Sequence, residues 1–429
     1  MPQILDHPQR YTTVNELHAR PFPALNAPCA TAYLAIKEPV LAQNRDRGTD
    51  LAHLVQLLDR HGSAHPQPGA THFSGPLGRT ELKWESHTEF VTYSGFTPGL
   101  SDRAFDPAEM QVFPPNWLST APGKIMTAIL MRVEEMPQDD EQMRVKLDAW
   151  FVPESLAVAR VVDGAAIVAG DFRIDASGFM RFAVFVRPGT GRRRIGRIVQ
   201  RLCEIETYRA MSMLGLIEAR ALTERLNALD PRLSSLVSGL DNATRPPETA
   251  LYELLAISAE LEAMAVQNSF RFGATGAYEA IVDQRIAALR EQRVDGRQTF
   301  GEFMMRRYDP AMRTVKSTEA RLKSMAERAM RAAELLRTRV DVQRSSQNQS
   351  LLESMDRRAD LALRLQHTVE GLSVVAISYY ALGLASYVAA PFIEMAHAPK
   401  AAATAALTPV VIGVVWLMVR RIRRQMHAS

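Results

Sequence analysis

The sequence predicts an α+β cytoplasmic domain, followed by a long helical stalk and a two-helix transmembrane hairpin. Two uncharged runs near the C-terminus, residues 371–393 and 401–419, lead to this prediction. Each run is long enough to cross about 30 Å of hydrocarbon. A helical pattern rich in Arg, Glu and Gln precedes the first run. In the first 187 residues, short strand-like segments are separated by turn residues, which is typical of a mixed domain.

Composition limits the class of protein and its partners. The chain has 429 residues, 47% hydrophobic and 23% charged, which is ordinary for a globular protein with a full core. The formal charge is +4, and Arg is densest beside the two apolar runs. This distribution favours anionic lipid over nucleic acid, because aromatic residues for base stacking are not interleaved with it. We therefore expect the lipid bilayer as a partner and no nucleic acid.

The two cysteines and the N-terminus indicate a compartment. Cys29 and Cys203 are too few for a disulfide framework or a zinc set, and they fit a reducing environment. The first residues lack the basic start and apolar core of a secretory signal. We therefore expect the N-terminal domain to lie in the cytoplasm.

Residues 1–187 are predicted to form the mixed α/β domain. Residues 1–26 are a short helical turn and a Pro-rich extended arm. Apolar spacing predicts a helix over 50–60, and residues 107–117 are a helix or an irregular turn. Alternation and β-branched content predict six to eight strands, at 30–36, 71–73, 80–85, 89–93, 124–133, 156–162, 165–174 and 180–186.

Residues 188–312 are predicted to form a helical cytoplasmic region. One apolar face contains Ile195, Ile198, Val199, Leu202, Ile205 and Met213. Pro and Gly residues predict breaks at 244–248 and 273–276. Between and after these breaks we expect helices at 250–270, 278–293 and 299–307.

Residues 313–370 are predicted to form the stalk. A helix continuous from 314 to 388 would be roughly 110 Å long, so it must pack on other helices, on other subunits or on both. An apolar face contains Leu322, Met325, Ala329, Leu336 and Val340, and resumes at Leu351. The polar stretch 343–350 between them is either an exposed stalk section or a buried Gln/Asn layer around an oligomer axis.

The hairpin is predicted to consist of transmembrane helices at 371–393 and 401–419, an outer loop at 394–400 and a basic tail at 420–429. Arginines flank the hairpin on one side of the membrane, which places both termini in the cytoplasm of a multi-pass inner-membrane protein. We expect seven of them to lie at the membrane surface: Arg357, Arg358, Arg364, Arg420, Arg421, Arg423 and Arg424. A buried hydrophobic hairpin is the alternative.

Polar groups in and beside the spans are the candidates for a pore. Hydroxyls at membrane depth usually bond a neighbouring helix or their own backbone, and the alternative is a pore lining. Glu394 and His397 of the outer loop are either solvated or part of a ring at a pore mouth. The pore or outer-loop candidates are Ser373, Tyr380, Gly383, Glu394 and His397.

A Gly- and Arg-rich turn is a candidate anion site. Gly189, Gly191, Arg192 and Arg193 lie between a predicted strand and a predicted helix, where helix amides and guanidiniums favour phosphate. The P-loop ending and the dinucleotide glycine spacing are both missing. An ordinary strand-to-helix turn is the alternative.

Three other clusters of polar residues are weaker candidates for a catalytic or metal site. His61, His65 and His72 form either a metal site or a plain polar loop. Alternation places Glu85, His87 and Glu89 on one strand face, which we expect to be solvated more readily than to be an acid–base or metal site. The cluster at 15–20 is a similar case. Known catalytic motifs are missing, so we predict no catalytic or metal residues, no cofactor and no enzyme.

Five segments resemble a bacterial family of predicted membrane-anchored proteins, a domain-of-unknown-function family. They are NELHARPF at 15–22, KWESHTEF at 83–90, RLCEIETYR at 201–209, LRTRVD at 336–341 and TVEGLSVVAISYY at 368–380. The resemblance covers nearly the whole chain. It implies membrane anchoring and no established activity.

The architecture is also similar to that of the CorA class of magnesium channels. Those proteins have a cytoplasmic mixed domain, a stalk helix that continues into the first span, a short outer loop, a second span and a basic C-terminus. The resemblance implies a homo-oligomer, a pentamer in that class, and a divalent cation as partner. The Gly-Met-Asn signature of the class is replaced here by Gly383-Leu-Ala385.

These observations lead to two functional hypotheses and a weaker third. The first is a CorA-like oligomeric cation channel or transporter with its pore along the first spans. The second is a membrane-anchored scaffold or sensor without transport activity. The third is an enzyme near the membrane that uses the N-terminal His and Glu residues.

Overall fold

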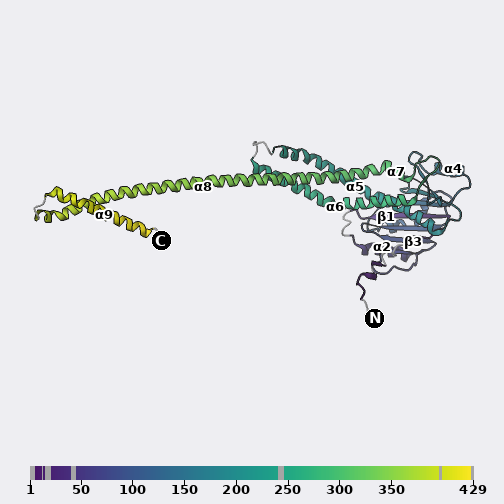
Figure 1. The fold of residues 1–429 in the computed structure, drawn as a ribbon. Coiled ribbons are helices and arrows are strands. Elements are labelled where there is room, and N and C mark those ends of the chain that lie inside the picture. The colour runs from purple at the N-terminus through teal and green to yellow at the C-terminus, as the bar shows by residue number, and fades with distance from the viewer. Residues whose placement is uncertain are drawn as a thin grey trace. The chain divides into compact units, whose positions relative to one another are not determined.

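The computed structural model describes residues 5–11, 13–14, 21–39, 45–239, 246–395 and 399–426 (Figure 1). The chain divides into two compact units. Unit 1 contains Met1–Arg245 and Tyr252–Ala333, and unit 2 contains Pro246–Leu251 and Glu334–Ser429. Unit 1 therefore joins the segments predicted as a mixed domain and as a helical region.

The described part of unit 1 contains one nine-stranded sheet in the order β2-β3-β4-β1-β5-β8-β7-β6-β9. Its strands are β1 (Cys29–Lys37), β2 (His72–Leu77), β3 (Thr80–Ser86), β4 (Phe90–Pro98), β5 (Lys124–Glu135), β6 (Ala157–Val161), β7 (Ala166–Ile174), β8 (Met180–Val186) and β9 (Gln292–Arg293). The eight strands predicted before residue 187 are present, with ends shifted by a few residues. The short β9 strand was not predicted.

The sheet is antiparallel except between β5 and β8. β1 lies at the centre and pairs with β4 on one side and β5 on the other. All nine residues of β1 are buried, so both faces of the sheet are covered at this strand.

Small helices cover one face of the sheet. They are α2 (Arg47–Arg60), η2 (Pro107–Val112), α3 (Pro115–Leu118) and α4 (Asp140–Trp150). Their apolar side chains, among them Leu54, Phe113 and Met143, join Leu34 and Ile36 of β1 in one core cluster. α4 was not predicted from the sequence, and only Met143 and Leu147 of this helix are buried.

A long helix covers the opposite face. α5 (Arg192–Ser238) buries Ile195, Ile198, Leu202 and Ile205, as the periodicity predicted. Met213 is half-buried, whereas Met211 is fully buried. The hydroxyl groups of Tyr33 on β1 and Thr207 on α5 lie 2.7 Å apart, which joins the sheet to this helix.

Three long helices pack together in unit 1: α5, α6 (Pro247–Leu289) and the first part of α8 (Asp309–Met395). Arg321 and Arg328 of α8 both pair with Asp230 of α5, and these guanidiniums lower the pKa of Asp230. Lys316 of α8 pairs with Glu279 of α6 at 2.7 Å. The short α7 (Phe300–Arg307) precedes α8, with Thr299 and Glu302 forming its capping box.

The break predicted at residues 273–276 is wrong, because α6 continues through both glycines. Phe272 and Thr275 are buried beside them. A Cβ added to Gly215 of α5 would lie 2.2 Å from the Thr275 hydroxyl oxygen, so the two helices approach closely here. This packing outweighs the cost of about 1 kcal/mol that each glycine adds to a helix.

The stalk and the first apolar run form one helix. α8 begins at Asp309, a few residues before the predicted start, because Pro310 is tolerated in a first helical turn. It continues through Pro391 to Met395, into the segment predicted as a loop at 394–400. α9 (Lys400–Met426) contains the second run and the arginines after it.

The predicted apolar face of the stalk is buried at Leu322, Met325, Ala329, Leu336 and Val340. Residues 343–350 are exposed in the single chain. This exposure agrees with the simpler interpretation of the polar stretch. A Gln/Asn layer formed by several copies stays a prediction.

Candidate functional site

Among the described residues, two helices contain a segment long and apolar enough to cross a membrane. One segment lies within Asp309–Phe392 of α8 and the other within Lys400–Ile422 of α9. Only 6% of each apolar window is buried, which excludes a hydrophobic hairpin hidden in the core. These are candidate membrane-spanning helices.

Burial in the hairpin is concentrated on one side of α8. Ser378 of α8 is 7% exposed and Val415 of α9 is 6% exposed. Figure 1 shows α9 folding back along the end of α8, and this contact explains why these two side chains are buried. The Ser378 hydroxyl has no hydrogen-bond partner in the described chain.

The predicted pore residues of α8 lie on the opposite side. A helix turns about 100° per residue, so Ser373, Tyr380 and Gly383 lie within about 40° of the point opposite Ser378. All three are exposed in the single chain. Glu394 is in the last turn of α8, and its side chain is not described. His397 lies outside the described residues.

The same side of α8 carries exposed apolar side chains before the span. Leu351, Met355, Leu365 and Val369 lie on it, and their exposed fractions are between 55% and 66%. Arg358 interrupts this apolar stripe near its centre line. A single chain therefore leaves a long apolar face of unit 2 uncovered.

The predicted membrane-surface arginines lie at helix positions that flank the spans. Arg357, Arg358 and Arg364 are exposed on α8, and Arg364 pairs with Asp360 at 3.0 Å. Arg420 and Arg421 are exposed on α9, and the Arg420 guanidinium lies 4.9 Å from the Trp416 ring centre. Arg423 and Arg424 belong to α9, and their side chains are not described.

The Gly- and Arg-rich turn has the geometry of an ordinary connection. Gly189 has φ of +83°, which glycine adopts without strain. Gly191 caps α5, and its carbonyl oxygen accepts hydrogen bonds from the amides of Arg194 and Ile195. The amides of Arg194 and Ile195 are therefore used within the helix, and an anion site at the amides of Arg192 and Arg193 stays a prediction. Arg192 and Arg193 point their side chains into solvent.

The structure does not gather the predicted histidine loop into a metal site. His65 pairs with Asp59 at 2.7 Å, and the Nδ1 atom of His72 is buried. No group of three or more metal-ligating side chains occurs in the described residues. Of the cluster at 15–20, nothing lies within the described part of the chain.

The prediction that Glu85, His87 and Glu89 occupy a solvated face is wrong. Glu89 is 1% exposed and lies against α6. Its carboxylate accepts hydrogen bonds from Arg271 and from the Tyr278 hydroxyl at 2.9 Å, and it lies 3.9 Å from Lys37 Nζ. Burial and Glu89 raise the pKa of Tyr278, and burial lowers the pKa of Lys37.

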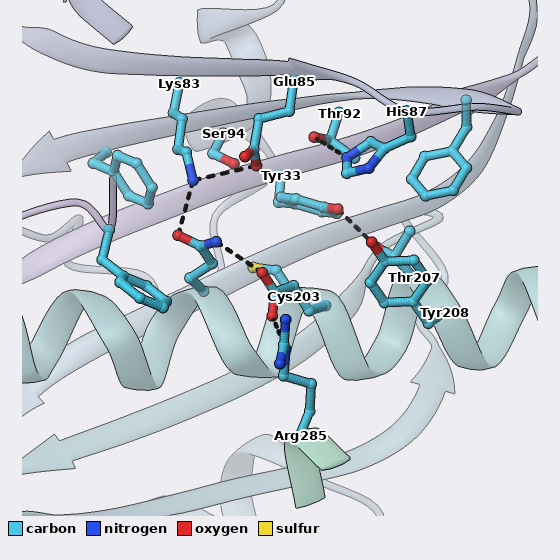
Figure 2. Close-up of a pocket in the computed structure, with 15 residues that line it drawn as sticks. Tyr33, Lys83, Glu85, His87, Thr92, Ser94, Cys203, Thr207, Tyr208 and Arg285 are labelled. Atoms are coloured by element: carbon cyan, nitrogen blue, oxygen red, sulfur yellow. Dashed lines mark hydrogen bonds and ion pairs between the residues drawn. The ribbon is translucent and has the colours of Figure 1, made fainter. Parts of the chain in front are cut away.

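Glu85 and His87 line a cavity of about 210 Å³ between the sheet and α5. Figure 2 shows Lys83 and Glu85 pointing from β3 toward α5, with Arg285 of α6 on the far side. Alternation in the strands explains this lining. Lys83 is opposite Ser94 and Glu85 is opposite Thr92 in the β3–β4 register, and all four side chains face the cavity.

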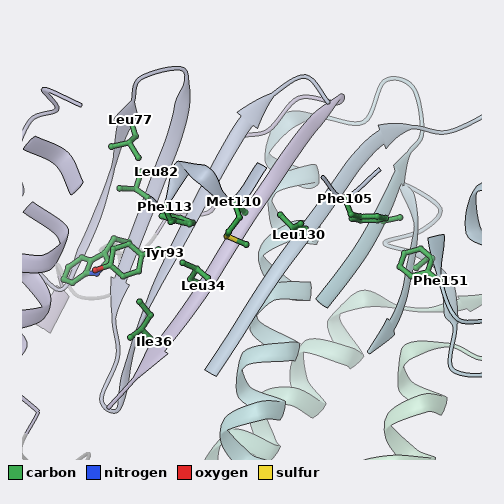
Figure 3. Close-up of a cluster of buried hydrophobic side chains, with 14 of the residues drawn as sticks. Leu34, Ile36, Leu77, Leu82, Tyr93, Phe105, Met110, Phe113, Leu130 and Phe151 are labelled. Carbon is green, nitrogen blue, oxygen red and sulfur yellow. The ribbon is translucent and has the colours of Figure 1, made fainter. Parts of the chain in front are cut away.

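The intervening residues of the same strands face the core. Figure 3 shows Leu82 of β3 and Tyr93 of β4 among the buried apolar side chains on the other face of the sheet. Both are 0% exposed. The core therefore fixes the two strands that present the polar wall of the cavity.

A chain of polar contacts crosses the cavity from β3 to α6. Lys83 Nζ lies 3.2 Å from Glu85 Oε2 and donates to Gln200 Oε1 at 2.9 Å. Gln200 Nε2 donates to Glu204 Oε1 at 2.7 Å, and Arg285 pairs with the other oxygen of Glu204. Two cations and two carboxylates balance each other in this chain.

Aromatic rings form the rest of the lining. His87 stacks on Phe90 with ring centres 4.4 Å apart, and Tyr208 of α5 meets Phe90 edge-on at 6.0 Å. These three residues also line a more open neighbouring cavity of about 500 Å³. Phe22 borders the first cavity, where Pro23 lies against Gly196.

The cavity does not present an activated nucleophile. Cys203 lies in its wall, and burial raises the pKa of this thiol, so it stays protonated near neutral pH. Burial also raises the pKa of Tyr33. Lys83, Ser94, Gln200, Glu204 and Arg285 were not predicted as site residues, although the alternation of Lys83 with Glu85 was visible in the sequence.

The fold defines a class: a mixed α/β domain that leads through long helices to two candidate membrane-spanning helices. The family model described as "Protein of unknown function (DUF3422)" matches residues 5–426. The chain therefore belongs to this family. No curated protein matches it.

Proposed function

We propose that the protein is a homo-oligomeric membrane protein of CorA-like architecture that passes a cation, divalent as in that class, through a pore lined by α8. The observation that carries the proposal is the uncovered stripe on one side of this helix. It begins at Leu351, continues through Val369 and reaches Tyr380 and Gly383. Apolar side chains outside the membrane favour burial against another surface. The same stripe on a second copy of the chain offers a matching apolar surface.

The hairpin geometry agrees with this role. α9 contacts the Ser378 side of α8, which leaves Ser373, Tyr380 and Gly383 directed away from α9. In a ring of copies these residues would face the common axis, and α9 would face lipid. The arginines after the second span would lie at anionic head groups on the cytoplasmic side of an inner membrane.

Cysteine cross-linking tests the oligomer with a matched pair. Val369 is on the stripe, and His367 is on the other side of α8 at nearly the same depth. Cys29 and Cys203 are buried, so they contribute little background. We expect Val369→Cys to form disulfide-linked copies in membranes and His367→Cys to form far fewer. Equal cross-linking of both, or a monomeric mass in detergent, would contradict the proposal.

Ion flux then separates a channel from an anchor. Purified protein in liposomes is expected to pass Mg²⁺ or another divalent cation down its gradient. The second candidate function is a membrane-anchored sensor, and the cavity in unit 1 favours it because a ligand site needs no pore. An oligomer without flux would support the sensor and reject the channel.

A further inference from the structure

The cavity between β3, β4 and α5 has the features of a constructed binding site. Its polar wall is held by the core on the other side of the sheet, and Lys83 is only 5% exposed. Its volume of about 210 Å³ corresponds to roughly seven water molecules at about 30 Å³ each. It is smaller than the pockets of about 300 Å³ or more that hold drug-sized ligands. A single ring system fits within it.

The charges of the lining select against an ionic ligand. Glu85 is matched by Lys83, and Glu204 is matched by Arg285. A ligand with a net charge would have to break one of these pairs or remain uncompensated in a partly buried site, and both cost free energy. A neutral molecule leaves the pairs intact.

Two polar atoms of the lining are available to a ligand. Lys83 Nζ lies 3.2 Å from Glu85 Oε2, and no hydrogen bond joins Glu85 Oε1 to another described residue. The Ser94 side chain is 8% exposed and likewise makes no hydrogen bond to a described residue. Glu85 Oε1 can accept a hydrogen bond from a ligand, and the Ser94 hydroxyl can donate or accept one.

The aromatic part of the lining favours a flat molecule. The His87 and Phe90 rings are stacked with an interplanar angle of 21°, and Tyr208 meets Phe90 at 74°. A ring placed here contacts aromatic faces and edges in the offset or edge-on geometries that aromatic pairs prefer. Its polar edge would then be directed toward β3 and β4.

We propose that this cavity binds an uncharged, planar heteroaromatic ring with hydrogen-bond donors and acceptors on its edge, of the nucleobase type. Ser94 and Glu85 recognise the edge, and the rings of Phe90 and Tyr208 contact the apolar surface. All of these residues lie in unit 1. Binding therefore does not depend on the proposed pore.

Calorimetric titration of the full-length protein in detergent tests the proposal. The probes are adenine, cytosine and hypoxanthine, with choline, glutamate and AMP as charged comparisons. We expect saturable binding of at least one base and weaker or no binding of the charged molecules. Binding of choline or glutamate in preference to every base, or no saturable heat from any base at millimolar concentration, would overturn it.

Variants locate the binding to the cavity. Ser94→Leu fills the space beside Lys83, and Glu85→Gln keeps the shape while replacing an acceptor with a donor on one atom. Each is expected to weaken base binding about tenfold or more, since a buried polar contact is lost. Glu81→Gln is the matched control, because Glu81 is on the same strand but exposed outside the cavity. Its affinity is expected to equal that of the wild type.

Folding of each variant is checked by circular dichroism and thermal unfolding. If Ser94→Leu fails to fold, Glu85→Gln alone decides. If Glu85→Gln leaves base binding unchanged, the ligand binds elsewhere and this site is rejected. The same conclusion follows if Glu81→Gln weakens base binding as much as Glu85→Gln does.

Discussion

The carboxylate of Glu89, the residue before β4, accepts a hydrogen bond from the hydroxyl of Tyr278 on α6 at 2.9 Å, and both Arg271 and Lys37 approach the same carboxylate. This contact joins residues 189 positions apart in the sequence. It fixes the middle of α6 against the end of the sheet. Glu89 is 1% exposed, so the ion cluster is buried rather than solvated.

Glu89→Gln is expected to destabilise unit 1 by about 3 to 5 kcal/mol, because it leaves the half-buried Arg271 guanidinium without its counter-charge. Denaturant unfolding followed by circular dichroism measures the change. Glu81→Gln on the exposed part of β3 is the control and is expected to change stability by less than about 0.5 kcal/mol. Equal stability of the two variants would show that the Glu89 cluster contributes nothing.

Gly196→Ala is expected to destabilise the protein by about 1 to 3 kcal/mol. A Cβ at this position would lie 1.7 Å from the Pro23 carbonyl oxygen, so the segment from Phe22 to Leu25 must move away from α5. Gly276→Ala on α6 is the opposite case, since nothing lies within 4 Å of its added Cβ. That variant is expected to gain about 0.5 to 1 kcal/mol, and thermal unfolding compares the two.

Stability is expected to fall as pH decreases below about 6.5, with His53 contributing. Burial lowers the pKa of His53, which lies between the Tyr93 hydroxyl and the Trp117 carbonyl oxygen. The unfolded chain therefore binds the proton more readily, and the stabilisation present above the unfolded pKa is lost as pH falls toward the folded pKa. The slope from one proton is at most about 1.4 kcal/mol per pH unit.

His53→Gln tests this assignment. It is expected to lower stability at pH 7 and to reduce the slope of unfolding free energy between pH 7 and pH 5. A slope identical to that of the wild type would assign the pH dependence to other groups.

Neither cysteine is expected to react quickly with a thiol reagent in the folded protein. Burial raises the pKa of Cys29 to about 12 and raises that of Cys203 further. A chromogenic disulfide reagent is expected to label no thiol rapidly at neutral pH and two after denaturation. Rapid labelling of the native chain would contradict the described burial of both side chains.

Two neighbouring tyrosines test which side of α8 lines the proposed pore. Tyr380 is on the side opposite Ser378, whereas Tyr379 is displaced by about 100° toward the flank. Both are more than 70% exposed in the single chain. Tyr380→Ala is expected to change divalent cation flux about tenfold, and Tyr379→Ala is expected to change it little. If Tyr380→Ala and Glu394→Ala both leave a measured flux unchanged, the pore is not lined by these residues.

Much of the fold could be predicted from the sequence, where one local pattern decided the structure. Alternation identified the strands from β1 to β8, and the apolar face from Ile195 to Ile205 identified α5. The predictions at residues 273–276 and at Glu89 were wrong for a common reason. From its neighbours in the sequence alone, Gly276 is expected to break a helix and Glu89 is expected to be solvated. Packing between elements distant in the sequence overrides both expectations.

The cavity could be predicted only in part. Lys83, Glu85, Thr92 and Ser94 occupy alternating strand positions, so a shared face was visible. This face contacts Gln200, 117 positions away from Lys83 in the sequence. It also lies near Arg285, because α6 passes beside the cavity. No spacing rule connects such segments. The pore candidates stay predictions, since only an assembly of several copies would bring them together.

The order of the strands in the sheet has a consequence for folding. β2, β3, β4, β1 and β5 are joined by antiparallel contacts, as are β8, β7 and β6, and only β5 and β8 connect the two groups side by side. Among these contacts, the longest loop is closed by the antiparallel contact of β1 with β5, which pairs Cys29 with Val133, whereas the parallel contact pairs the nearer positions Ile129 and Met180. Closing such a long loop is slow. The nucleobase-sized cavity is lined by Tyr33 of the first group of strands, by residues of α5, which follows the second group in the sequence, and by Arg285 of α6. It therefore exists only once the ribosome has synthesised most of unit 1, and ligand binding would report that this unit has finished folding.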